Sequence, residues 1–168
     1  MRKQILIGLV AASVLGSCGT VSSIVQNTLP YNSNFVVAQG SPAHTTLASV
    51  GSGTNLSQMF GASSNVKNIT AGTASLTVTS GAQGVGVFKE VKVYLTSGGN
   101  EILVAERDRI ADNLGGTLSL DVKSGVLDAV MKSGTAVQQR IVYTLKSSPT
   151  SDLNVRSSIT FSSVPQEK

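Results

Sequence analysis

The chain has 168 residues but only one cysteine, one histidine and no tryptophan. With no second cysteine, Cys18 cannot close a disulfide, and the lone His44 excludes any zinc site or triad built on several imidazoles. Aromatic residues make up 4% of the chain, too few to favour a stacking platform for sugar rings or single-stranded nucleic acid. We therefore expect no catalytic site, no cofactor and no metal ion, with His44 in an exposed loop.

Charged side chains are absent from residues 4–66. Only Arg2 and Lys3 precede this segment. Without them the net charge falls from +4 to +2, because two of the 13 basic residues leave and all nine acidic residues stay. The basic residues that remain form no run, so the sequence lacks the stripe of Lys and Arg that nucleic-acid binding requires. We expect no nucleic-acid partner.

Residues 18–66 are about half Ser, Thr, Gly and Asn. Such a composition is typical either of a flexible tether or of a loop-rich start of a domain. Apolar residues such as Phe35, Leu47 and Phe60 need burial, which favours a short tether to Thr28 followed by folded structure.

The first 17 residues have the layout of a secretory signal. Two positive charges precede the apolar segment 4–15, which ends in small side chains. This segment is too short for a membrane-spanning helix, which needs roughly 20 apolar residues.

Leu15-Gly16-Ser17-Cys18 resembles the lipobox of bacterial lipoproteins. The resemblance implies that residues 1–17 are a signal peptide and that Cys18 is a lipid anchor, acylated as the first residue of the mature protein. Residues 18–28 would then be the lipidated N-terminus with its short tether, and residues 29–168 a single domain. The alternative is that Cys18 is an ordinary small residue at a conventional cleavage site, or an exported thiol.

Beyond residue 71 apolar and polar residues alternate with a period of two, which is typical of half-buried antiparallel strands. The residues expected to face inward are Leu76, Val78, Val91, Val93, Leu95, Leu118, Leu120, Val122, Val137, Ile141, Tyr143, Leu145, Leu153, Val155, Ile159 and Phe161.

Turn residues separate these segments. Ser97-Gly98-Gly99-Asn100 predicts a tight turn, and Ser147 to Asp152, with Pro149 inside it, predicts a loop. Gly81, Gly84 and Gly86 are superficially similar to a phosphate-binding loop, but a strand rather than a helix is expected to follow, which favours a hairpin connection.

One helix is expected. Ser124 is a candidate N-cap, Asp128 precedes Lys132 by four residues, and Gly134 follows the end. Its apolar face would hold Val126, Leu127, Val130 and Met131. The sequence thus predicts an all-β, immunoglobulin-like antiparallel β-sandwich of about seven to eight strands with one short helix.

Acidic residues gather at Glu101, Glu106, Asp108 and Asp112, where a calcium or paired-carboxylate site is conceivable. Arg107 and Arg109 interleave with them, and the spacing lacks the regular ladder of a calcium loop. An extended segment would place the two signs on opposite faces, so we expect a solvated edge strand.

The stretches FKEVKVYLTSGGNEILVAERD and RIVYTLKSSPTSDLNVRSSITF, together with the lipobox, resemble small β-sandwich lipoproteins of Gram-negative bacteria of the Bacteroidota type. The resemblance implies a lipid-anchored location in the cell envelope, at the outer membrane, on either its periplasmic or its outer side. We expect a non-enzymatic binding or structural module whose partners are the membrane, through the lipid, and an envelope protein. The alternative is a carrier that holds a small apolar or lipid ligand between its two sheets.

Overall fold

The structure is a computed structural model that describes residues 25–26, 30–60, 65–133 and 136–166. Nine antiparallel strands and only short helical segments make up this part, so the all-β prediction is confirmed. The strands are β1 (Val25–Gln26), β2 (Tyr31–Val37), β3 (Thr46–Val50), β4 (Val66–Ser80), β5 (Phe88–Ser97), β6 (Asn100–Arg107), β7 (Thr117–Val122), β8 (Gln138–Leu145) and β9 (Leu153–Pro165). The helical segments are α1 (Leu56–Phe60), the 3-10 turn η2 (Val85–Val87) and α2 (Asp128–Met131).

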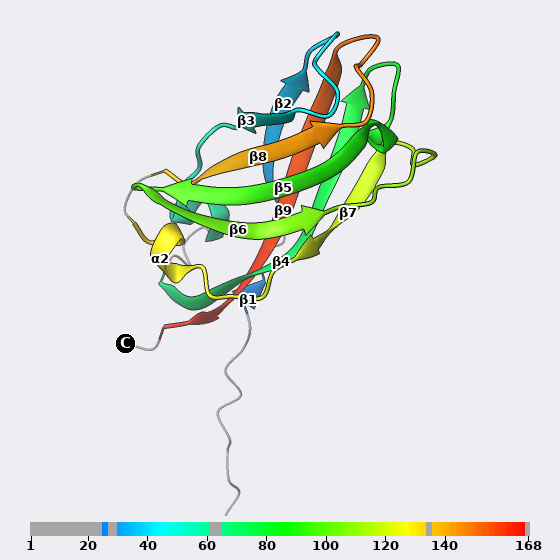
Figure 1. The fold of residues 1–168 in the computed structure, drawn as a ribbon. Coiled ribbons are helices and arrows are strands. Elements are labelled where there is room, and N and C mark those ends of the chain that lie inside the picture. Colours follow the sequence, from blue (N-terminus) through cyan, green and yellow to red (C-terminus); the bar gives the residue numbers. More distant parts are fainter. Residues whose placement is uncertain (1–24, 27–29, 61–64, 134–135, 167–168) are drawn as a thin grey trace, which may run out of the picture.

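The strands follow the order β1-β9-β4-β7-β6-β5-β8-β3, and β2 pairs with β9 beside β1. Two groups of strands meet through only two residue pairs between β6 and β7, Ala105 with Val122 and Glu106 with Asp121. In Figure 1, β5, β6 and β8 cross in front of β4 and β9. The strands therefore enclose one interior between the two groups.

That interior is lined by the inward positions of the alternating strands. Phe88, Ile141, Leu153 and Phe161 are at most 1% exposed, as the period of two predicts. An aromatic contact joins the two groups: the Tyr143 ring of β8 lies 5.6 Å from the Phe35 ring of β2, and it also lies 5.6 Å from the Phe88 ring of the neighbouring strand β5. Burial of these side chains supplies most of the driving force for the fold.

Side chains, and not a hydrogen-bonded ladder, join β2 to the segment that follows β3 and to the start of β8. The Tyr31 hydroxyl lies 2.8 Å from the Ser52 carbonyl and 2.9 Å from the Val137 carbonyl, and the Gln139 side chain donates to the Tyr31 carbonyl. Burial raises the pKa of Tyr31 to about 12, although a hydrogen bond from the Gln139 backbone opposes the shift. The hydroxyl therefore stays protonated and able to donate.

A bulge in β4 fixes the position of α2. Asn68 has a φ of 53°, and the Asp128 carboxylate accepts hydrogen bonds from the backbone N–H of Asn68 (3.2 Å) and Ile69 (2.7 Å). Burial would raise the pKa of Asp128, but the Ile69 N–H, the Lys132 ammonium and the Asn68 N–H together lower it. The hydrogen bonds of this carboxylate thus connect α2 to β4.

The predicted helix is shorter than expected. Only residues 128–131 are helical, and the N-cap is Leu127, not Ser124. The reason is that the Leu127 N–H donates to the Ile69 carbonyl of β4 instead of to a carbonyl of its own segment, and residues 123–127 form no regular helix. Val126, expected on the buried face, is 55% exposed. The prediction of a single helix is also wrong, since α1 is present; Gly134 lies outside the described residues.

Two connections differ from their predictions. The segment 81–87 joins β4 to β5, which do not pair with each other, so it is a crossover between the two groups and not a hairpin. Alternation reveals which face of a strand is buried but not which strand lies beside it. The turn at Gly98 and Gly99 is confirmed, with φ of 56° and 83° between the paired strands β5 and β6.

The edge-strand prediction for the Glu106 region is wrong, because β6 lies between β5 and β7. Asp108 and Arg109 lie beyond the end of this strand at Arg107. Its alternating charges reflect an exposed sheet face, not an exposed edge. Val25 and Gln26, predicted within the tether, pair with Ser163 and Ser162 and so belong to the sheet.

Candidate functional site

Four connections come together at one end of the molecule, at the top and upper right of Figure 1. They are residues 38–45, 81–87, 108–116 and 146–152, which link β2 to β3, β4 to β5, β6 to β7 and β8 to β9. We call this set the loop platform. Loops on a rigid scaffold are the usual place for binding residues.

Backbone groups tie these connections to one another. The Lys146 N–H donates to the Val87 carbonyl (2.8 Å), and the Val85 N–H donates to the Gly115 carbonyl (2.9 Å). The Gly40 N–H donates to the Pro149 carbonyl (3.0 Å). Each bond joins two adjacent connections, and together the three bonds link all four. The loop platform is therefore a surface braced by backbone hydrogen bonds.

Side chains add further links. The Thr150 N–H donates to the Gln83 side-chain oxygen (3.1 Å), and the Ala82 N–H donates to the Ser151 hydroxyl (3.0 Å). The Gln39 N–H donates to the Asp152 carboxylate (2.7 Å). Each bond satisfies a backbone group that a loop would otherwise leave to water.

Two glycines allow the connections 81–87 and 108–116 to approach closely. A Cβ atom at Gly86 would lie 2.2 Å from the Asp112 carbonyl oxygen, and one at Gly84 would lie 2.5 Å from the Gly115 carbonyl oxygen. Both contacts are with backbone, which cannot swing away. Glycine is therefore required here for close packing, whereas Gly115 has open space around its own Cβ position.

A cavity of about 430 Å³ opens among these connections. It is lined by Gln83, Gly84, Gly86, Val87, Asp112, Lys146 and Ser147. Within it the Lys146 ammonium contacts both the Ile110 carbonyl oxygen and the Asp112 carboxylate. The lining combines one cation, one carboxylate and neutral hydrogen-bonding side chains with the apolar surface of two glycines and Val87.

The loop platform lies at the far end of β9 from β1. β9 begins at Leu153, next to the platform, whereas Val25 of β1 pairs with Ser163. Ten residues of strand at about 3.3 Å each place these ends roughly 30 Å apart. In Figure 1, β1 lies at the bottom of the molecule and the platform loops lie at the top.

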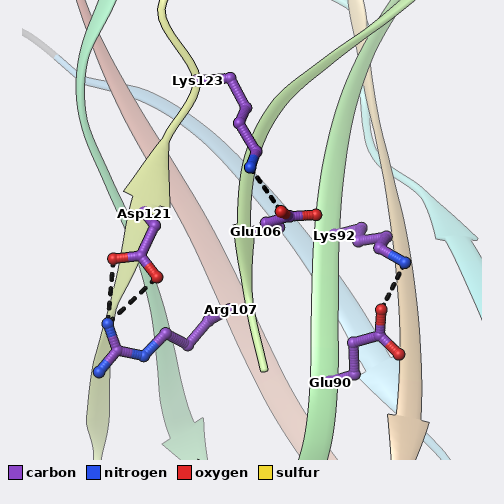
Figure 2. Close-up of polar contacts among 6 residues, drawn as sticks. All are labelled: Glu90, Lys92, Glu106, Arg107, Asp121 and Lys123. Carbon is purple, nitrogen blue, oxygen red and sulfur yellow. Dashed lines mark hydrogen bonds and ion pairs between the residues drawn. The ribbon is translucent and has the colours of Figure 1, made fainter. Parts of the chain in front are cut away.

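Each acidic side chain at the conceivable carboxylate site forms an ion pair with its own basic residue. On the outer face of β5, β6 and β7, Figure 2 shows Glu106 with Lys123, Glu90 with Lys92, and Asp121 with Arg107. Glu101 is paired with Arg140 and Asp108 with Arg109. The structure does not bring these carboxylates together, and the described residues contain no cluster of three or more His, Cys, Asp or Glu side chains that could hold a metal ion.

Arg140 and Glu101 form the best-aligned pair of this outer face. Two guanidinium nitrogens donate to the two carboxylate oxygens, at 2.6 and 2.5 Å, and the guanidinium lies 4.6 Å from the centre of the Tyr94 ring. The hydrogen bond from Arg140 lowers the pKa of Glu101 despite the opposing effect of burial. Such a carboxylate is a structural acceptor rather than a candidate acid or base.

The other predicted positions are placed as follows. His44 is exposed in the connection 38–45, as predicted, and its φ is 58°. Cys18 and the signal-like segment lie outside the described residues. Lys146 was not predicted as a site residue. The available signal was its position: it is the first residue after the alternating strand β8, at the start of the loop that contains Pro149.

Comparison of the chain with family models and with curated proteins found no match. Among the described residues, no helix has the length and apolar character needed to cross a membrane.

Proposed function

We propose that this protein is a lipid-anchored envelope lipoprotein that binds a partner through the loop platform, without enzymatic activity. The lipobox-like residues Leu15 to Cys18 support the anchor. The observation that supports the binding role is the braced polar surface at the end opposite β1. A chain anchored through its N-terminus would present such a surface away from the membrane.

The location that we propose is the outer membrane of a Gram-negative bacterium, with the lipid on Cys18 as the membrane contact. Two or three acyl chains hold a small domain on a bilayer, since each buried CH₂ contributes roughly 0.8 kcal/mol. For the fold, an immunoglobulin-like sandwich remains our prediction of its class.

The carrier alternative has less support from the described interior. The Tyr143 ring packs against Phe35 of the other strand group and against Phe88 of its own group, and the Phe60 and Phe161 rings lie 6.5 Å apart. These rings occupy the space that an apolar ligand between the sheets would need. We therefore assign the binding role to the exposed loop platform.

The anchor is tested by replacing Cys18 with serine in the full-length protein. We expect the variant to leave the membrane fraction, or to persist as uncleaved precursor, because serine has no thiol for lipid attachment. Intact mass measurement of the wild type should show an acylated N-terminal cysteine. Membrane retention of Cys18→Ser together with an unmodified wild-type mass would overturn the anchor.

The binding surface is tested with a matched pair of bulky substitutions. Ser147→Trp places an indole at the cavity of the loop platform, and Ser119→Trp places one on the exposed outer face of β7. In a strain whose deletion has an envelope phenotype, Ser147→Trp should behave like the deletion and Ser119→Trp like the wild type, with both proteins folded and anchored. The reverse result would move the binding surface to the sheet face.

A further inference from the structure

The cavity of the loop platform contains a cation whose pairing is incomplete. An ammonium group has three N–H donors, and the Lys146 ammonium uses two, for the Ile110 carbonyl oxygen and the Asp112 carboxylate. Within the part of the chain that the structure describes, no third acceptor contacts it. The third donor is open to solvent or to a group that comes close to the ammonium.

The two members of this ion pair differ sharply in exposure. The Lys146 side chain is 27% exposed, whereas the Asp112 side chain is 89% exposed. The Lys146 ammonium donates to the Ile110 carbonyl oxygen. Its second acceptor, the Asp112 carboxylate, belongs to a solvent-exposed residue of the connection 108–116. An ion pair with so exposed a partner adds little net stability, so Asp112 is easily replaced by another acceptor.

The surroundings of Lys146 fit a group of similar size and charge to Asp112. The cavity of about 430 Å³ is within the range that small ligands and single side chains occupy. Two of its lining residues carry neutral hydrogen-bonding groups: the Ser147 hydroxyl, and the Gln83 side-chain amide, whose oxygen already accepts from the Thr150 N–H. The close packing of Gly86 against the Asp112 backbone holds the wall of the cavity in place.

We infer that Lys146 binds a carboxylate group of the protein partner, which displaces the Asp112 carboxylate. The inference rests on the proposed function, since it assigns a chemistry to the partner of the loop platform. When no partner is bound, the Asp112 carboxylate occupies the place of the partner's carboxylate and pairs with the Lys146 ammonium. The incoming carboxylate belongs either to an acidic side chain or to a chain terminus, and these two sources require different probes.

Three peptide probes isolate the carboxylate. They are acetyl-Gly-Glu-Gly-amide with a side-chain carboxylate, acetyl-Gly-Gln-Gly-amide with none, and acetyl-Gly-Gln-Gly with a free terminus. Each is titrated into the full-length, ¹⁵N-labelled protein in detergent micelles, and the amide signals of Gly84, Gly86 and Ser147 are followed. We expect saturable shifts with the side-chain or the terminal carboxylate, and none with the neutral peptide.

Substitution of Asp112 separates this inference from a purely structural ion pair. Asp112→Asn removes the competing carboxylate, so it should tighten binding of the carboxylate peptide by about threefold. The matched control is Asp121→Asn, which removes a carboxylate paired with Arg107 on the outer sheet face and should change nothing. Lys146→Met should abolish the carboxylate-dependent shift; since Lys146 also contacts Ile110, its fold is checked by the same spectra.

Equal responses to the three peptides, or no tightening in Asp112→Asn, would show that the pair only braces the two connections. That outcome would overturn the carboxylate site but leave the proposed function standing, because the Ser147→Trp experiment does not depend on the partner's charge. Failure of the Ser147→Trp experiment with intact peptide binding would instead place the carboxylate site apart from the partner surface.

Discussion

The two ends of the molecule are held together by different means. At the loop platform, long connections pack backbone against backbone, and the closest approaches occur at Gly84 and Gly86. At the opposite end, which we call the β1 end, polar side chains join the elements, chiefly the partly buried Asp128 and the buried Tyr31. We therefore expect added atoms at Gly84 or Gly86 to destabilise the platform, and removal of the polar groups of Asp128 or Tyr31 to destabilise the β1 end.

This difference follows from what each end connects. The platform loops carry few apolar side chains, so their backbone groups bond to neighbouring loops. At the β1 end the chain leaves regular strands at the β4 bulge and at the gap between β2 and β3, where backbone groups lack ladder partners. Side chains form hydrogen bonds with these backbone groups instead. Substitutions of matched residues at the two ends test this difference.

The largest effect is expected from Gly86→Ala at the platform. Its Cβ would lie 2.2 Å from the Asp112 carbonyl oxygen, so the connections must separate, and we expect a loss of about 3 kcal/mol in the free energy of unfolding. Gly115→Ala is the control, because its Cβ meets nothing within 4 Å and its φ is not positive. Urea unfolding of both variants gives the comparison, and equal stability of the two would remove the steric account of the platform.

At the β1 end, Asp128→Asn should cost about 2 kcal/mol, since it removes the charged acceptor of two backbone N–H groups and the partner of Lys132. The pKa of Asp128 is lowered in the folded protein, so its contribution is fully present above the unfolded pKa of about 3.9. It is lost as the pH falls through the folded pKa. Unfolding curves of wild type and variant should therefore differ at pH 7 and converge in strong acid; a difference that persists there would contradict the charge-based clamp.

The strands that lead into the loop platform could be predicted from the sequence better than the contacts between its connections. The alternating residues of β5, β8 and β9 identify their buried faces correctly, because burial on one face imposes a period of two. The contacts between connections are non-local: Gly86 and Asp112 lie far apart in the sequence, and neither residue type reveals its neighbour. The cavity around Lys146 could not be predicted for that reason.

The β1 end departs further from its prediction. The pattern of apolar residues after Ser124 and the Asp128–Lys132 spacing are typical of a helix, and the ion pair forms at 3.0 Å. Most of the segment nevertheless has no helical structure, because the Leu127 N–H donates to the Ile69 carbonyl of β4. Tertiary hydrogen bonds outweigh the modest propensity of a short helix.

Tyr31→Phe should cost about 1 kcal/mol, because it leaves the Ser52 and Val137 carbonyls without the phenol proton that they share. Tyr143→Phe is the matched control: this ring is also buried, but within the described residues its hydroxyl makes no hydrogen bond. Thermal unfolding should place Tyr31→Phe below wild type and Tyr143→Phe close to it. If both variants lost the same stability, the hydrogen bonds from the Tyr31 hydroxyl to the Ser52 and Val137 carbonyls would contribute nothing specific to this region.

The smallest effect is expected from Asp112→Asn, the same chemical change as Asp128→Asn but made at the platform. Asp112 is 89% exposed, and its carboxylate accepts no backbone N–H in the described structure, so we expect a change below about 0.5 kcal/mol. Lys146 keeps its bond to the Ile110 carbonyl, and the backbone bonds between the connections remain. Urea unfolding of the two variants side by side measures the contrast directly. If Asp112→Asn cost as much as Asp128→Asn, the platform would depend on a side-chain clamp like the β1 end, and Asp112 could not yield its place to a partner's carboxylate at little cost.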